Sequence, residues 1–167
     1  MTNEGLGSWL ERRMAMTPNN EALVFDGKSY TYRDLALRTR TVAHGLREMG
    51  VRQGDCVAYF GFNDPAALEM MFAVGTLGAT YLPLNARLTA EEAAYILTDA
   101  NCTLVVFGGE QAGPAEELST MDVPVREWIG LEDAQWARCS YEDLTAGRSE
   151  SMIDVQVGLD DVCILMY

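Results

Sequence analysis

The stretch DCVAYFGFNDPAALEMMFAVGTLGATYLPL (residues 55–84) decides the fold of this chain. It holds two short apolar runs separated by a helix-like segment, and the residues that follow repeat the same alternation. Strands that alternate with helices form β-α-β units with right-handed crossovers, so the sequence predicts an α/β fold with a parallel sheet layered with helices. The expected strands and helices are 56–60, 65–78, 80–84, 90–99 and 103–107.

Local sequence signals support both helix starts. Asn63 or Asp64 precedes Pro65, which suits an N-cap followed by proline at the first helical position. Thr89 and Glu92 fit the capping box, in which each residue bonds the backbone of the other. The first of these helices has few charged residues, so most of its circumference should be covered by other elements.

The segments on either side are less regular. Before residue 55 we expect a short helix, a hairpin with its turn at Asp26-Gly27, and a helix capped by Thr31 that runs to about Met49. Beyond residue 108 the pattern predicts a short helix near 115–118 and a strand at 123–129, followed by an irregular segment. The final run VCILMY (162–167) is typical of a strand buried on both faces of a parallel sheet.

Composition limits the cell compartment and the partners. At 167 residues and 49% hydrophobic, the chain can form one compact domain. Its formal net charge of -13 opposes non-specific attraction to nucleic acid or anionic membranes. The four cysteines include no C-x-x-C pair, and the sequence lacks a signal peptide and the roughly 20 apolar residues of a membrane span. We therefore expect a cytoplasmic protein with free thiols, no membrane span and no nucleic-acid partner.

The sequence holds little catalytic equipment. Neither G-x-G-x-x-G nor G-x-x-x-x-G-K-[ST] is present, which excludes the usual dinucleotide and Walker loops. His44, the only histidine, lies off the apolar stripe of its helix and is predicted to be a solvated surface residue. Lys28, the only lysine, is expected to be an exposed cation in the hairpin. Trp9, Trp128 and Trp136 are too dispersed to indicate a stacking platform. We expect no catalytic residue and no metal site in this chain.

Three stretches resemble the N-terminal part of the adenylate-forming (AMP-binding) enzymes, in particular acyl-CoA synthetases of the fatty-acid-CoA ligase type. They are SYTYRDLALRTRTVAHGLREMGVRQGDCVAYF (29–60), ALEMMFAVGTLGATYLPLNARLTAEEAAYIL (67–97) and GLDDVCILMY (158–167). The third is similar to the strand that, in the family, enters a Ser/Thr/Gly-rich phosphate loop closed by lysine. The resemblance implies that residues 1–167 form a truncated N-terminal part of the adenylation domain, ending just before that loop.

The resemblance also implies a reaction. The parent enzyme would adenylate a carboxylic acid with ATP and Mg²⁺ and then transfer the acyl group to CoA. In CoA synthetases the loop after the strand 80–84 lies near the CoA nucleotide, so Asn85, Ala86 and Arg87 are the expected CoA-binding residues. An arginine beside a capped helix start offers donors to a phosphate, although Arg87 could equally pair with a surface carboxylate. Because the family's later catalytic elements are missing, this chain alone is expected to be inactive.

Two other interpretations are open. The chain could be part of an amino-acid adenylation domain, although PLNARLTAEE (83–92) favours the acyl- or aryl-CoA synthetase branch. It could also be a free-standing, non-catalytic α/β binding or interaction module. An exposed terminal strand is an association hazard, which argues against the second interpretation and predicts a homo-oligomer formed through exposed core surface.

Overall fold

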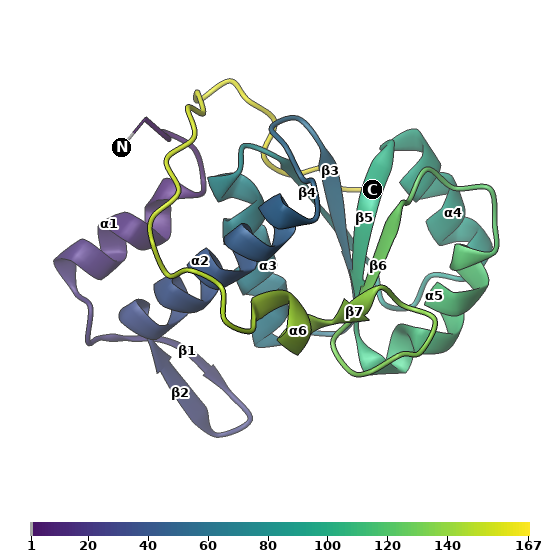
Figure 1. Cartoon of the computed structure of the whole chain (residues 1–167), viewed down its shortest axis with the longest axis horizontal. Helices are drawn as coiled ribbons and strands as arrows, with labels where there is room; N and C mark the ends of the chain where they lie inside the picture. Colours follow the sequence, from purple (N-terminus) through teal and green to yellow (C-terminus); the bar gives the residue numbers. More distant parts are fainter. Residues whose placement is uncertain (1) are drawn as a thin grey trace.

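The computed structural model describes residues 2–167, in which a five-stranded sheet is layered between helices and a two-stranded hairpin projects from one end (Figure 1). The strands are β1 (Glu21–Phe25), β2 (Lys28–Thr31), β3 (Cys56–Phe60), β4 (Thr80–Leu84), β5 (Cys102–Phe107), β6 (Glu127–Gly130) and β7 (Cys139–Ser140). The helices are α1 (Ser8–Met16), α2 (Tyr32–Glu48), α3 (Pro65–Thr76), α4 (Ala90–Asp99), a 3₁₀ turn (Gly109–Gln111), α5 (Ala112–Ser119) and α6 (Tyr141–Thr145).

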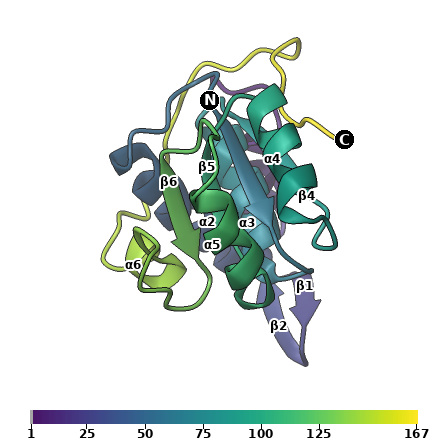
Figure 2. The ribbon, with the colours of Figure 1, turned by 90° about the vertical axis from the view of Figure 1, so that its right-hand side faces the viewer.

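The sheet is parallel throughout, as the sequence predicts. Its strand order is β4-β3-β5-β6-β7, so the chain moves from β3 to one side and then crosses to the other side. Helices α2, α3 and α6 cover one face, which we call the α3 face, and α4 and α5 cover the other, the α4 face (Figures 1 and 2). This order places a topological switch point between β3 and β5.

Two apolar clusters fill the space between the sheet and its helices. Each fully buried Val, Leu, Met or Phe side chain contributes about 1.5–3 kcal/mol. On the α3 face the cluster includes Val42, Leu46, Val57, Met70, Val74, Leu104 and Ile129. On the α4 face it includes Phe60, Leu82, Leu97, Val105, Phe107 and Leu118.

Tryptophans also meet on the α4 face. The rings of Phe107 and Trp136 stack with centroids 4.9 Å apart, and Trp128 packs edge-on against Trp136 at 6.0 Å. The expectation that the tryptophans are dispersed is therefore wrong for two of them. The loop after β6 folds back over the sheet, so Trp136 lies next to Trp128 and Phe107 in space.

The predicted helix starts are confirmed. The Asp64 side chain accepts a hydrogen bond from the Ala66 N–H at 2.8 Å at the start of α3. Thr89 and Glu92 form the reciprocal capping box of α4. The predicted covering of α3 is also present, since even its charged residue, Glu69, is only 1% exposed.

The terminal apolar run is not a doubly buried strand. It lies beside β4 at the edge of the sheet, where the Tyr81 N–H donates to the Cys163 carbonyl and the Leu165 N–H donates to the Tyr81 carbonyl. Val162 and Met166 are 59% and 81% exposed. The prediction of burial on both faces is wrong for the structure described, because an apolar run indicates β propensity but not which elements cover it.

The segment that leads to this edge is held at two places. Near its start, the backbone of Ser151 contacts α2. Further along, the Thr2 N–H donates to the Asp154 carboxylate at 2.7 Å, and Asn3 forms a parallel bridge with Val157. These contacts give a segment without helices or long strands a defined path across the molecule.

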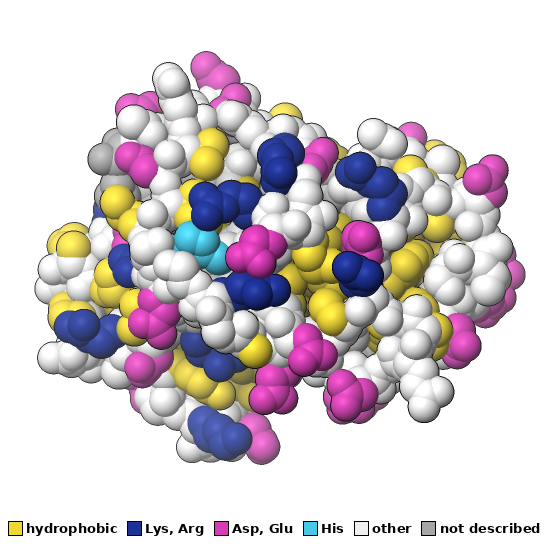
Figure 3. Space-filling model, viewed as in Figure 1, with side chains coloured by type: hydrophobic (Ala, Val, Ile, Leu, Met, Phe, Trp, Pro, Cys, Tyr) yellow, Lys and Arg dark blue, Asp and Glu magenta, His cyan; other side chains and the backbone are white. Residues whose placement is uncertain are grey.

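His44 is the second correction. It is 7% exposed, not solvated, because the segment around Ser151 covers it. Its Nε2 lies 3.0 Å from the Ser151 carbonyl, and its Nδ1 lies 3.0 Å from the Arg47 guanidinium. Nε2 therefore carries the proton and donates it to Ser151, while Nδ1 accepts from Arg47. The surrounding face mixes arginine with acidic side chains (Figure 3).

The region beyond residue 108 was only partly predicted. The short helix exists as α5, but the strand begins at Glu127 and not at residue 123. Neither β7 nor α6 was expected. The sequence nevertheless contained a signal for α6, because Ser140 and Asp143 form a capping box at the start of this helix.

Candidate functional site

The carboxyl ends of the parallel strands form the candidate site. In open α/β sheets, ligands bind in the crevice outside these ends, at the switch point of the strand order. Two neighbouring hollows lie there, separated by the loop after β3. We call them the switch-point hollow, between the loops after β3 and β5, and the β4 hollow, beside the loop after β4.

The switch-point hollow has a volume of about 350 Å³. It is open, and its walls carry polar groups of both signs together with the glycines that follow β5. Its lining includes Arg38, Tyr59, Asn63, Gly108, Glu132 and Tyr141.

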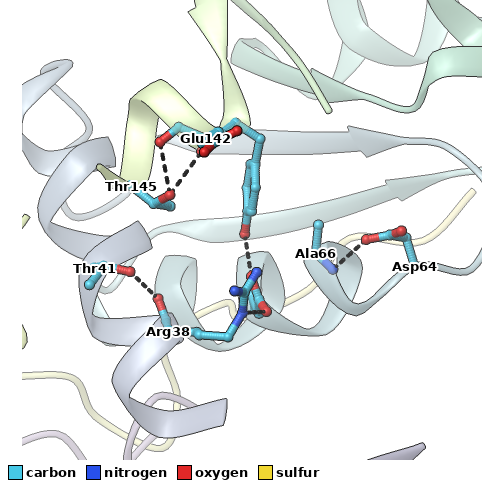
Figure 4. Close-up of polar contacts among 8 residues, drawn as sticks. Arg38, Thr41, Asp64, Ala66, Glu142 and Thr145 are labelled. Atoms are coloured by element: carbon cyan, nitrogen blue, oxygen red, sulfur yellow. Dashed lines mark hydrogen bonds and ion pairs between the residues drawn. The ribbon is translucent and has the colours of Figure 1, made fainter. Parts of the chain in front are cut away.

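A polar trio adjoins the switch-point hollow, and its central carboxylate, Glu69, is buried (Figure 4). Arg38 of α2 forms a two-pronged ion pair with the carboxylate of Glu69 in α3, and the Arg38 Nη2 lies 3.2 Å from Oε2. Tyr141 of α6 donates its hydroxyl to the same Oε2 at 3.0 Å. The trio links three helices, so its role is to position the wall of the hollow.

The electrostatics of the trio agree with this positioning role. Burial, reinforced by the negative charge of Glu69, raises the pKa of Tyr141 well above its ordinary value. The hydrogen bond to Glu69 raises the pKa of Arg38. Tyr141 is therefore a neutral donor and Arg38 a permanent cation at neutral pH, and every oxygen of Glu69 is engaged.

The β4 hollow brings together all three residues expected from the sequence. It measures about 390 Å³, and Asn85, Ala86 and Arg87 lie along one side of it. The Asn85 Oδ1 accepts the Arg87 N–H at 3.0 Å, and the Leu88 N–H closes the turn onto the Asn85 carbonyl at 3.1 Å. This turn gives the loop a defined shape.

The side chain of Arg87 is exposed and available. Within residues 2–167, no carboxylate lies within ion-pair distance of it, so the alternative that it pairs with a surface carboxylate is not seen. Its guanidinium can present a planar set of donors to a phosphate. The next helix, α4, begins three residues later, but its first turn carries Glu91 and Glu92, so the arginine supplies the positive charge.

Sequence reasoning missed Gln111. This side chain is only 4% exposed, lines the switch-point hollow, and donates a long hydrogen bond of 3.5 Å from Nε2 to the Ala86 carbonyl. It therefore supports the 85–88 turn from behind. The sequence held no signal for it, since the stretch Gly108-Gly109-Glu110-Gln111 fits any exposed turn.

Two buried tyrosines brace the walls of the β4 hollow, one through the loop after β3 and the other through the first turn of α3. Tyr59 donates to the Phe62 carbonyl at 3.0 Å, and Tyr81 donates to the Ala67 carbonyl at 3.1 Å. Burial raises the pKa of both phenols, so they remain protonated donors at neutral pH.

The part of the chain that the structure describes holds no cluster of three or more His, Cys, Asp or Glu residues that could bind a metal ion. Lys28 is exposed in the hairpin, as predicted, and lines neither hollow. Among the described helices, none is long and apolar enough to cross a membrane.

A parallel sheet with a switch point, and hollows at the carboxyl ends of its strands, defines the class of α/β ligand-binding domains. Within that class, residues 10–167 match the family of AMP-binding enzymes, and the chain belongs to this family.

Curated relatives carry the names of CoA ligases. The chain is 40% identical over 167 residues to a feruloyl-CoA synthase of Amycolatopsis, covering all of this chain and 31% of that protein. It is 36% identical over 138 residues to an indoleacetate–CoA ligase of Aromatoleum aromaticum, covering 76% of this chain and 27% of that protein. The chain therefore spans about a third of the length of the curated relatives that it matches.

Solved structures of CoA ligases share the fold of this chain. A fatty acyl CoA synthetase of Mycobacterium tuberculosis superposes with a TM-score of 0.89 at 27% identity, covering all of this chain and 32% of that one. The anthranilate CoA ligase AuaEII, at 22% identity, shares the fold with a TM-score of 0.92 over 99% of this chain and 32% of its own.

Proposed function

We propose that this chain supplies the N-terminal part of an ATP-dependent acyl-CoA synthetase, an acid-thiol ligase, and that residues 1–167 precede the phosphate-binding loop of that enzyme. A carboxylate is a poor electrophile, so the enzyme first joins it to AMP with release of pyrophosphate. The thiol of CoA then displaces AMP and forms the thioester. The family match over residues 10–167 and the CoA-ligase relatives support this proposal.

The contribution of this chain is binding. We propose that Asn85, Ala86 and Arg87 contact the nucleotide end of CoA, with the Arg87 guanidinium on a phosphate. The single observation that carries this assignment is the exposed guanidinium of Arg87 in the β4 hollow, which has no carboxylate partner in the described part of the chain. The Asn85 turn orients the backbone that presents it.

We expect Mg²⁺ to accompany ATP in the whole enzyme. The described residues offer no donor cluster that suits a metal ion, so no step at Mg²⁺ is assigned to this chain.

Calorimetric titration with CoA tests the binding site. The chain should bind CoA, and Arg87→Ala should weaken binding about tenfold, as expected for the loss of one charge-assisted phosphate contact. The matched control is Arg126→Ala, an exposed arginine just before β6, at the amino end of the sheet. Equal affinity of Arg87→Ala and the unchanged chain would refute the assignment.

In the AMP-binding family the phosphate loop is closed by a lysine. The chain alone should give no ATP–pyrophosphate exchange, because its only lysine, Lys28, is an exposed hairpin residue outside both hollows. Measurable exchange would contradict this expectation. In the longer enzyme, thioester formation from an aromatic or fatty acid would support the acyl-CoA synthetase, whereas activation of amino acids alone would favour an amino-acid adenylation domain.

We also propose a cytoplasmic location. The four cysteines are free thiols in the described structure, which suits a reducing compartment. Cell fractionation that recovers the protein with an oxidising compartment would exclude this location.

We propose in addition that the chain self-associates. An apolar groove is bordered by exposed Trp9, Leu159 and Val162, and a dimer through this groove would cover them. Light scattering should detect a dimer, and a monomer at high concentration would exclude it.

A further inference from the structure

An aromatic ring stands in the wall of the β4 hollow. Phe62, in the loop after β3, is 49% exposed and lines both hollows at the carboxyl ends of the strands. Single exposed hydrophobic side chains are ordinary on protein surfaces. Phe62 differs from Phe25, which is exposed in the hairpin, because it shares a hollow with Arg87.

The backbone that presents Phe62 is fixed on both sides. Buried Tyr59 binds the Phe62 carbonyl, and Asp64 caps α3 through the Ala66 N–H. Gly61 permits the close approach, since a Cβ at that position would lie 2.9 Å from the Tyr59 hydroxyl. A side chain on a pre-organised loop loses little conformational freedom when a ligand binds.

The chemistry of the wall fits one kind of ligand. An aromatic side chain can stack on a nucleobase, because every base has a π-face. The guanidinium of Arg87 suits a phosphate. A hollow of about 390 Å³ lies within the usual range of small-molecule sites.

We propose that Phe62 is a binding residue that stacks on the purine base of a phosphorylated nucleotide, while Arg87 binds a phosphate of the same molecule. The inference rests on the proposed function, in which that nucleotide is the 3′-phosphoadenosine 5′-diphosphate end of CoA. Phe62 thereby makes the site selective for a base as well as for a phosphate.

The test uses the whole chain and two probes. Calorimetry with 3′-phosphoadenosine 5′-diphosphate should show binding about tenfold weaker for Phe62→Leu, which keeps the apolar character but removes the aromatic face. Phe62→Trp should bind at least as tightly as the unchanged chain. Phe25→Leu is the matched control and should leave binding unchanged.

Inorganic pyrophosphate is the second probe, because it has phosphates but no base. Phe62→Leu should bind it like the unchanged chain, whereas Arg87→Ala should weaken both probes. If Arg87→Ala weakens binding and Phe62→Leu does not, stacking is refuted and the proposed function stands. If the unchanged chain binds neither probe, both proposals fail. If Phe62→Leu weakens both probes equally and lowers the melting temperature, Phe62 is structural and the inference is overturned.

Discussion

The two faces of the sheet are packed in different ways. On the α4 face, helices α4 and α5 contact the strands through an apolar cluster capped by stacked aromatic rings. On the α3 face, the apolar cluster adjoins a buried carboxylate, Glu69, and the nearby surface of α2 carries a buried histidine, His44. Burying an ionised carboxylate costs free energy unless it is paired and hydrogen-bonded.

The difference lies in how far along the chain the polar partners are found. Glu69 binds Arg38, which is 31 residues away, and Tyr141, which is 72 residues away. The α3 face therefore depends on segments that meet only in the folded state. The α4 face depends mainly on side-chain volume, so the two faces should respond differently to substitution and to pH.

The largest effect is expected on the α4 face. Phe107→Ala should lower the free energy of unfolding by about 4 kcal/mol, since it leaves a cavity and removes the stacking partner of Trp136. Urea unfolding followed by tryptophan fluorescence measures the change. Phe25→Ala in the hairpin is the control, and a cost for Phe107→Ala below 1 kcal/mol would contradict the packing described.

On the α3 face, Glu69→Ala should cost about 3 kcal/mol, because the Tyr141 hydroxyl loses its acceptor and Arg38 its partner. This lies at the low end for a broken buried pair, since the Arg38 side chain is 52% exposed and can be hydrated. Glu69→Gln keeps an acceptor for Tyr141 and should cost less. Equal unfolding free energies for the two variants would show that the acceptor is unimportant.

The next largest effect is expected at alkaline pH, where the α3 face should lose stability through the ionisation of Tyr141. The pKa of Tyr141 is raised in the folded state, so its contribution is fully present below the unfolded value of about 10 and is lost as pH rises towards the folded value. Stability should fall above about pH 10. In Tyr141→Phe, urea unfolding at pH 9 and pH 11 should show a smaller fall than in the unchanged chain. An identical fall would mean that Tyr141 does not titrate with unfolding.

A smaller effect is expected at the start of α4. Thr89→Ala removes one half of the capping box and should cost about 1 kcal/mol. Thr98→Ala, at an exposed position near the end of the same helix, is the matched control and should be close to neutral. A Thr89→Ala variant as stable as the control would show that the cap adds nothing to the α4 face.

The smallest effect on the free energy of unfolding is expected in the β4 hollow. Arg87→Ala should change the free energy of unfolding by less than about 0.5 kcal/mol, because its side chain is exposed and has no ion pair in residues 2–167. Thermal unfolding measured beside the CoA titration checks this. A large loss of stability would give Arg87 a structural role and weaken its assignment to phosphate binding.

Sequence predicted best where the signal is local. The caps at Asp64 and Thr89, and the alternation of strands and helices from residue 56 to 107, are decided by neighbouring residues, and all appear in the structure.

Long-range packing explains the failures. His44 looked solvated because the residues around Ser151 that cover it are 107 positions away. Trp136 appears isolated in the sequence, but in the structure the loop after β6 places it against Phe107. Gln111 could not be recognised because its partner, the Ala86 carbonyl, carries no side-chain signal.

The pairing of residues 2–4 with residues 154–157 has a practical consequence. Asn3 and Glu4 bind the backbone at Val157, and Thr2 binds Asp154, so the first few residues moor the tail that runs to β4. Proteolytic removal of these residues would loosen the tail around Asp154 and Val157, while its contacts at Ser151 and at β4 would remain. Nicks in the tail should follow such trimming, and a bulky fusion at the amino end would have a similar loosening effect.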